Sequence, residues 1–274
     1  MKKLLTVAAV GVVAMFLLGG TCEGPPSLEP PDISKVVMGE SDVTVYWNPS
    51  VDEENEDFTG YNVYLFTDST LYDLAGDNDT LADYLVNSSP ISDTTYTITG
   101  LDQDTIYYIQ VRTVSGEDNV GDYNLSQPYV KASPRPERTV TLELEVSPSS
   151  QCAIDFASGE IGTRGDLSTT WGDMWVDYDS QLDSVWFDSP MHGNTNCRTT
   201  LLENKGQMNF DDLWEVTQDP TEESVGIDEG DLIVAKTEDG NYVKIYVEVL
   251  DKTGSPPTVK ITYAYQNVTG FPGF

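Results

Sequence analysis

The chain is dominated by short segments in which apolar and polar residues alternate, the pattern with a period of two that is typical of β-strands. Val43, Val45 and Trp47 alternate with Thr44 and Tyr46, so the first three side chains are expected to face a core. Turn residues separate such segments at the spacing of a β-sandwich. Strands are expected in the first half at residues 32–37, 42–47, 60–66, 94–98, 105–114 and 127–132.

The second half begins with another alternating segment, whose apolar positions are Val140, Leu142, Leu144 and Val146. Three further segments predict an antiparallel meander at residues 232–237, 242–249 and 258–265. The first two flank Asp239-Gly240, a turn sequence typical of a β-hairpin. Helical periodicity is absent from this half. We therefore predict an all-β protein with two β-sandwich-like domains in tandem, the first immunoglobulin-like and the second ending in a three-stranded meander.

The chain starts with an export signal. Two lysines precede the apolar run Leu4 to Leu18, which is too short to span a bilayer comfortably, and small residues lead to Cys22. This stretch resembles the signal of bacterial lipoproteins, which implies cleavage before Cys22 and acylation of that residue. It departs from the usual pattern in that Leu18 lies one position early and Thr21 precedes the cysteine. An ordinary secretory signal cut nearby is the alternative.

Prolines indicate the domain boundaries. A proline-rich stretch follows Cys22 and predicts an extended tether, and Ser133-Pro-Arg-Pro-Glu137 predicts a stiff linker. The 274 residues are enough for two cores of ordinary size. The expected segments are a signal at 1–21, a tether at 22–29, a first domain at 30–134, a linker at 135–139 and a second domain at 140–274.

The formal net charge of −32 excludes nucleic acid as a partner, because a polyphosphate requires clustered lysines and arginines. The 14 basic residues are scattered along the chain.

With Cys22 acylated, Cys152 and Cys197 are an even pair in an exported protein, which predicts a disulfide between them. Two buried free thiols are the alternative.

The run from Gly100 to Val114 resembles the E-to-F corner of a fibronectin type III domain. In that family a tyrosine at the position of Tyr107 closes a corner through its hydroxyl group. The resemblance covers about 105 residues and implies that Trp47, Tyr61, Leu101 and Tyr107 are structural core residues. The polar passage 67–90 is longer than the usual connection of the family, so the edge strand there is in doubt.

The end of the chain resembles another family. Residues 230–245 and 260–266 are similar to the C-terminal strands of the HmuY family of surface lipoproteins. Several members of that family bind haem through a pair of axial side chains, typically histidines. This chain has a single histidine, His192, and its neighbour Met191 could not reach the opposite face of the same haem. Met191 and His192 are therefore weak haem candidates that need a second ligand from elsewhere.

Catalytic motifs are missing from the sequence. His192 is the only imidazole that could activate a nucleophile, and no G-x-S-x-G, H-E-x-x-H, C-x-x-C or phosphate-binding loop occurs. We therefore expect no enzymatic activity. Calcium is a weak alternative, because two D-x-D sequences could each supply two carboxylates from one turn. These candidates are Asp77, Asp79, Asp177 and Asp179, and solvated acidic loops are the favoured explanation for them.

These features predict a non-enzymatic, lipid-anchored protein of the bacterial cell envelope, in the outer membrane or at the cell surface. Its expected role is adhesin-like, scaffold or accessory binding. The expected partners are the membrane, through the lipid anchor, and another protein or a surface polysaccharide. Capture of a small ligand such as haem by the C-terminal domain is the alternative, and an accessory role in polysaccharide processing is the third. No cofactor is expected apart from these calcium and haem alternatives.

Overall fold

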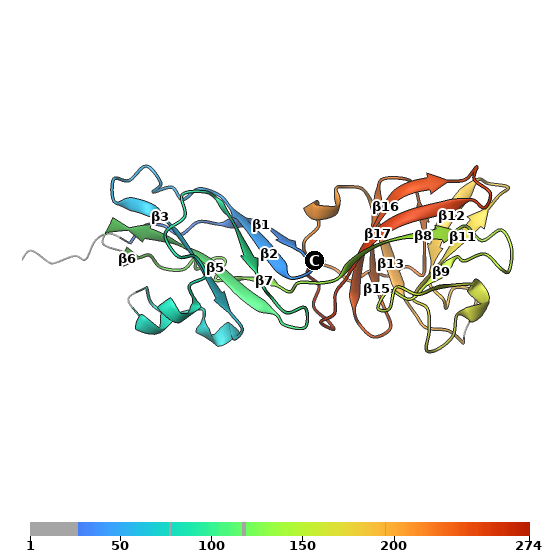
Figure 1. Ribbon diagram of the computed structural model, residues 1–274, viewed down its shortest axis with the longest axis horizontal. Coiled ribbons are helices and arrows are strands. Elements are labelled where there is room, and N and C mark those ends of the chain that lie inside the picture. The colour runs from blue at the N-terminus through green and yellow to red at the C-terminus, as the bar shows by residue number, and fades with distance from the viewer. Residues whose placement is uncertain (1–26, 77, 117–118, 195) are drawn as a thin grey trace, which may run out of the picture.

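The computed structural model describes residues 27–76, 78–116, 119–194 and 196–274, and it contains two β-sandwich modules arranged end to end (Figure 1). The fold-class prediction of tandem all-β domains is confirmed. The C-terminus lies at the waist between the modules, whereas the described chain begins at the outer end of the first module (Figure 1). The last residues therefore return to the junction after completing the second module.

The first module packs a three-stranded sheet of order β1-β2-β4 against a sheet of order β3-β5-β6, in which β7 also pairs with β5. All neighbouring strands are antiparallel. The strands are β1 (Ile33–Met38), β2 (Asp42–Trp47), β3 (Phe58–Phe66), β4 (Thr95–Thr99), β5 (Tyr107–Ser115), β6 (Asn119–Val120) and β7 (Val130–Ala132).

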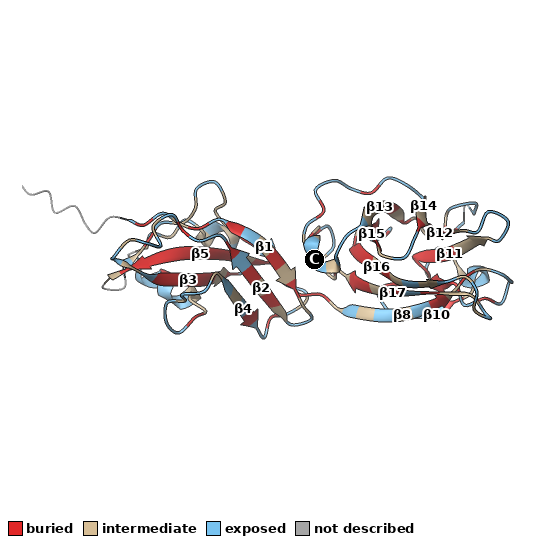
Figure 2. Cartoon of the chain, turned by 90° about the horizontal axis from the view of Figure 1, so that it is seen from above, coloured by how far each residue is buried: buried red, intermediate tan, exposed pale blue. Residues whose placement is uncertain are grey.

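The core of the first module lies between these sheets (Figure 2). Alternate residues are buried in β2, whereas β3 and β5 are buried along most of their length. Trp47 meets Tyr61 edge to face at 5.5 Å, and the Tyr61 hydroxyl accepts a hydrogen bond from the Ser50 amide at 2.7 Å. The Tyr107 hydroxyl accepts one from the Asp102 amide at 3.0 Å, which fixes the turn that enters β5. Buried hydroxyl groups with such partners anchor turns to the core without leaving polar atoms unsatisfied.

The long passage at residues 67–90 covers the outer face of β3 and β5. It carries two 3₁₀ helices, η1 (Ser69–Leu71) and η2 (Asp79–Tyr84), and forms a small second core. Arg112 of β5 is fully buried beneath it and donates to the carbonyl oxygens of Leu74 and Tyr72 at 2.8 and 3.2 Å. The arginine thus fastens the passage to the sheet by satisfying carbonyl groups that a loop would otherwise leave unpaired.

The second module consists of two five-stranded sheets, ordered β13-β15-β16-β17-β8 and β10-β9-β11-β12-β14. Its strands are β8 (Glu137–Glu143), β9 (Ala153–Ile154), β10 (Ile161–Gly162), β11 (Met174–Asp179), β12 (Ser184–Asp188), β13 (Leu201–Gln207), β14 (Ser224–Ile227), β15 (Asp231–Lys236), β16 (Tyr242–Asp251) and β17 (Thr258–Tyr265). Its 3₁₀ helices include η4 (Arg164–Asp166) and η5 (Phe210–Asp212). The expected meander corresponds to β15, β16 and β17, which pair in that order.

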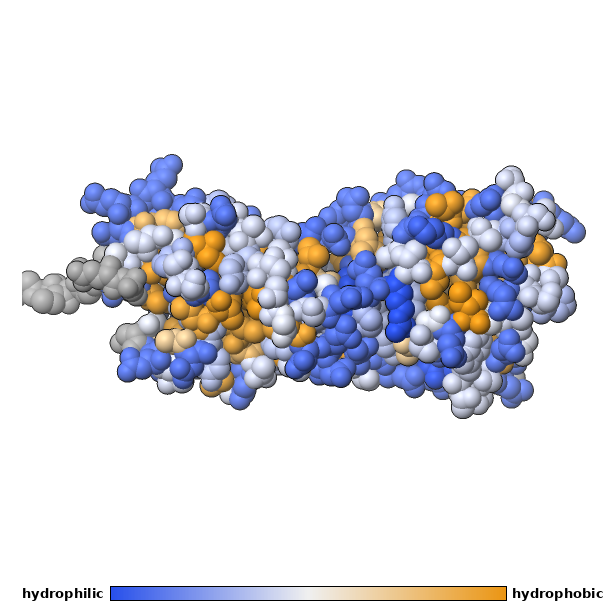
Figure 3. All heavy atoms as spheres, in the orientation of Figure 1, coloured by the Kyte–Doolittle hydropathy of each residue, from blue (hydrophilic) through white to orange (hydrophobic). Residues whose placement is uncertain are grey.

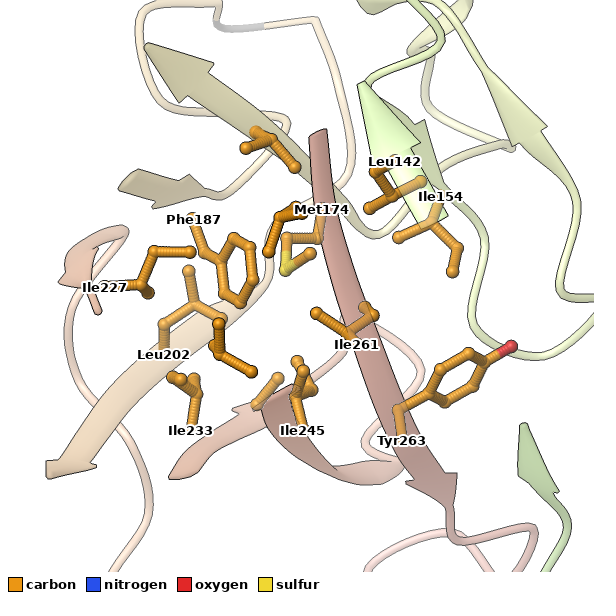
Figure 4. Close-up of a cluster of buried hydrophobic side chains, with 14 of the residues drawn as sticks. Leu142, Ile154, Met174, Phe187, Leu202, Ile227, Ile233, Ile245, Ile261 and Tyr263 are labelled. Carbon is orange, nitrogen blue, oxygen red and sulfur yellow. The ribbon is translucent and has the colours of Figure 1, made fainter. Parts of the chain in front are cut away.

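The main core of the second module fills the space between its two sheets (Figure 4). Phe187 and Met174 come from one sheet and face Ile245 and Ile261 from the other. These side chains lie at alternate positions of their strands, which is why a period-two sequence pattern marks them.

The structure differs from the sequence expectations at the strand ends. β8 begins at Glu137, inside the stretch 135–139 that was expected to be a linker, because its residues pair with β17. Val146 is exposed, since β8 ends before it. The last strand of the first module shortens to β7, because Gln127 uses its side chain to bond the Ile33 backbone. Within the described ranges, no helix has the length and apolar character needed to span a membrane.

Replacing Tyr107 by phenylalanine tests the corner that opens β5. Y107F removes the acceptor of the partly buried Asp102 amide, so it should lower the free energy of unfolding by about 1–3 kcal/mol. Urea unfolding of the full chain measures this. The control is Y46F, because the Tyr46 hydroxyl is bonded to none of the described residues. Equal losses in both variants would contradict the role of the Tyr107 hydroxyl.

Candidate functional site

The junction between the modules is held by polar side chains from both of them. The Gln266 amide, which is fully buried, donates to the carbonyl oxygens of Ser133 and Gly273 at 3.4 and 2.9 Å. Asn267 donates to the Gln103 side chain of the first module at 3.3 Å. The Arg135 amide donates to the Gly39 carbonyl at 2.9 Å. The junction is therefore a packed interface and not a free hinge.

The loop around Trp214 and the chain end pair with each other at this interface. The Phe274 amide donates to the Trp214 carbonyl and the Val216 amide donates to the Pro272 carbonyl, both at 2.9 Å. Trp214 and Phe271 then pack against the core cluster of the first module. On the face shown in Figure 3, mainly hydrophilic side chains cover the waist between the modules. The aromatic contacts thus join the two modules.

Two basic side chains are buried under η5 at the junction. Lys244 and Arg135 are each about 1% exposed, and both lie over the Phe210 ring, at 4.2 and 5.7 Å from its centre. The Lys244 ammonium donates to the Leu213 carbonyl at 3.0 Å, and Arg135 pairs with Glu137 at 3.0 Å. Cation–π contacts replace part of the hydration that burial removes.

Burial controls the protonation of this pair. Desolvation, reinforced by the nearby positive charge of Arg135, lowers the pKa of Lys244 to about 7. Desolvation also lowers the pKa of Arg135, although Glu137 opposes the shift. Near neutral pH, Lys244 exchanges a proton inside the interface, so the stability of the junction depends on pH.

A groove of about 280 Å³ opens beside these contacts, between the two modules. Its lining residues are Gln127, Tyr129, Val130, Lys131, Trp214, Glu215, Phe271 and Gly273. The first four come from the first module and the others from the second. Small-molecule sites often form at such domain interfaces and combine apolar walls with a few polar groups. This groove is the candidate functional site.

Most of the predicted site residues lie away from the groove. Trp47, Tyr61, Leu101 and Tyr107 are buried in the core of the first module. Cys22 and Asp77 lie outside the described residues.

The acidic candidates for calcium do not converge. Asp79 is exposed on η2, and Asp177 and Asp179 lie on strand β11, not in a turn as expected. The Asp179 carboxylate instead accepts the amides of Gln181 and Leu182, at 2.8 and 3.1 Å. Among the described residues, no group of three or more His, Cys, Asp or Glu side chains could hold a metal ion.

The haem candidates lie in the loop between β12 and β13. His192 is exposed, and the Met191 sulfur accepts a hydrogen bond from the Thr199 hydroxyl at 3.0 Å. This methionine sulfur is therefore engaged in bracing its own loop.

The structure does not contain the disulfide predicted between Cys152 and Cys197; both are free and buried. Cys152 packs in the core between the sheets, where desolvation raises its pKa to about 11. Cys197 lies in a loop and accepts a hydrogen bond from the Asn194 side chain at 2.9 Å. An even number of cysteines reveals nothing about their separation in the fold, which is why this prediction was wrong.

Sequence reasoning also missed the residues that build the groove. Trp214, Tyr129 and Phe271 lie in non-periodic segments or at the end of a strand, so no alternation marks them. Arg135 was assigned to a stiff linker, with no expectation of burial, yet it is almost fully buried. The one available signal was the presence of large aromatic residues in loops, where solvation normally favours small polar ones.

Comparison with known proteins defines the class of the first module. The fibronectin type III domain model matches residues 28–128, so this part of the chain is a fibronectin type III domain. Domains of this family are generally non-catalytic. The comparison with curated proteins gave no match.

The thiols can be counted to check the corrected cysteine assignment. In C22S, Cys152 and Cys197 should both react with a thiol reagent after unfolding without reductant, whereas the folded protein should react slowly because both are buried. Absorbance of the released reagent anion measures the count. If the two thiols react only after a reductant is added, the disulfide between Cys152 and Cys197 does form and the correction is contradicted.

The pKa of Lys244 predicts a pH-dependent effect of K244M. The folded pKa is about 7 and the unfolded value is near 10.5, so the unfolded chain binds more protons between these values and wild-type stability rises with pH. The stability of K244M relative to wild type should therefore be greatest below pH 7. It should fall above that by up to about 1.4 kcal/mol per pH unit.

Urea unfolding at pH 6, 7.5 and 9 measures this difference. K236M is the control, because Lys236 pairs with Asp219 at the surface and its folded pKa is raised, so it stays protonated over this range. A difference between K244M and wild type that is constant with pH would contradict the assigned titration.

Proposed function

We propose that this chain is a non-enzymatic, lipid-anchored binding and display protein of the bacterial cell surface. The observation that carries the proposal is a fibronectin type III domain joined by a packed interface to a second β-sandwich. Fibronectin type III domains suggest scaffold or binding roles. An interface of this kind keeps two modules at a fixed spacing, which suits presentation of a binding surface.

The elongated form supports an anchor at the start of the chain. The described part begins at Ser27, at the end of the first module that is remote from the junction (Figure 1). An acylated Cys22 would then attach the membrane to that end. The groove and the second module would be held one domain length away from the lipid surface, accessible to partners outside the cell.

The buried titratable groups support a non-enzymatic role, because they have structural partners. Desolvation raises the pKa of Asp173 to about 6, yet its carboxylate accepts from the Phe156 amide and from Arg198 at 3.0 and 3.2 Å. No serine or cysteine side chain bonds to His192 within the described residues. An activated nucleophile requires such a base in contact with it.

Capture of a small ligand is the alternative role. The resemblance of the C-terminal strands to the HmuY family motivates haem as that ligand, but the exposed His192 and the engaged Met191 offer no facing pair of axial groups. An accessory role in polysaccharide processing is the third candidate, and its support is the junction groove, whose lining combines aromatic and polar side chains.

Acylation and fractionation test the anchor. In a bacterium with a lipoprotein pathway, the full chain should incorporate a labelled fatty acid and sediment with membranes, while C22S should do neither because the thiol is the acceptor. C197S, the same substitution at a buried cysteine, should behave like wild type. Labelled, membrane-bound C22S would contradict the proposal, as would soluble wild-type protein.

A further inference from the structure

The junction groove has an aromatic side chain on each wall. Tyr129 and Trp214 are both half-buried, one from each module, and both line the groove. Trp214 is held in place because its carbonyl accepts from Phe274 and its ring packs against the core of the first module. Rings positioned in this way present apolar faces together with polar edges, which is the combination that stacks on sugar rings.

Four polar side chains of the groove are unused by the described part of the protein. Among the described residues, no hydrogen-bond partner is recorded for the Tyr129 hydroxyl, the Trp214 indole nitrogen, the Lys131 ammonium or the Glu215 carboxylate. Together they supply donors and an acceptor around an apolar floor that includes Phe271. Hydroxyl groups of a saccharide can donate to the carboxylate and accept from the other three.

Part of the backbone beside the groove is already engaged. Gln127 satisfies both the amide and the carbonyl of Ile33, at 2.8 and 3.1 Å. Glu215 pairs with Gly273 in an isolated bridge. The groove is also lined by Val130 and Lys131 of β7, a strand that pairs with β5 on one edge. Addition of a peptide strand to the other edge is therefore the competing binding mode, and the binding experiment has to distinguish it from saccharide binding.

Charge further restricts the ligand. The chain carries a formal net charge of −32, which repels polyanions, while the groove itself has one carboxylate and one ammonium group. A neutral, hydroxyl-rich ligand is not repelled by the net negative charge, and it can hydrogen-bond to both charged groups of the groove. The volume of about 280 Å³ is just below the roughly 300–1,000 Å³ typical of ligand sites, so the groove takes a short stretch of such a ligand.

A row of tyrosines extends the groove along the first module. The Tyr129 ring contacts Tyr72 at 5.5 Å and Tyr108 at 5.0 Å, and Tyr72 contacts Tyr123 at 5.5 Å. All four are half-buried and therefore partly accessible. Their edge-to-face packing restricts their motion, so they offer contact area at low entropic cost.

We propose that the junction groove binds a neutral saccharide chain, with Trp214 and Tyr129 stacking on its sugar rings and the tyrosine row contacting its further units. Glu215 and Lys131 bond its hydroxyl groups at the rim. This assignment rests on the proposed binding role and specifies its ligand class. It does not depend on the lipid anchor.

Titration calorimetry of the full chain in detergent tests the assignment. The probes are neutral oligosaccharides of two to six units: gluco-, manno-, xylo- and N-acetylglucosamine series. At least one series should bind at one site, more tightly with increasing length and with little dependence on salt. W214A and Y129A should each weaken binding by about tenfold or more. Y123A should weaken only the longer oligomers.

Matched variants separate binding from folding. W186A replaces an exposed tryptophan remote from the groove and should bind like wild type. E215Q and K131M change exposed rim side chains and should weaken binding while the unfolding midpoint is unchanged. Failure of every neutral series to bind would overturn the saccharide assignment, as would binding that needs a polyanion or a peptide.

The result also distinguishes this proposal from the proposed function. Saccharide binding that survives W214A, Y129A and E215Q would place the site elsewhere and leave the wider binding role intact. If the wild-type chain is not attached to membranes but still binds saccharide through Trp214, the anchor is contradicted and the groove assignment is not.

Discussion

A buried amide group lies at the centre of the contacts that join the two modules. Gln266 donates to the linker at Ser133 and to the chain end at Gly273, and its oxygen accepts from the Val268 amide at 3.0 Å. Inside a protein such a fully satisfied group is stabilising, whereas the same group with a partner removed would be costly. The packing of Trp214 and Phe271 against the first module depends on this chain end being held in place.

The fold could be predicted where it depends on local patterns. The alternation at Val43, Val45 and Trp47 predicted β2, because it follows the two-residue repeat of a strand. The Asp239-Gly240 turn predicted the hairpin of β15 and β16, because it is a local turn signal. The junction could not be predicted, because it combines residues 133–135, 210–216 and 266–274 from aperiodic segments. Such contacts between residues far apart in the sequence leave no local pattern.

The long passage at residues 67–90 determines which surfaces of the first module are open. By covering the outer face of β3 and β5 and anchoring to Arg112, it removes from solvent a sheet face that would otherwise be exposed. It also contributes Tyr72 to the aromatic row beside Tyr129. The long passage thus closes the outer face of β3 and β5 and adds a tyrosine to the aromatic row beside Tyr129.

The antiparallel strands of the first module have a mechanical consequence. If the molecule is tethered at its first residues and its ligand is held at the junction, tension runs along the length of the first module. Its strands are antiparallel and their hydrogen bonds lie across the strand direction, so several bonds in β1–β2 and β5–β7 share that load at once. A pull between tether and groove would therefore be resisted in shear rather than by opening one bond at a time.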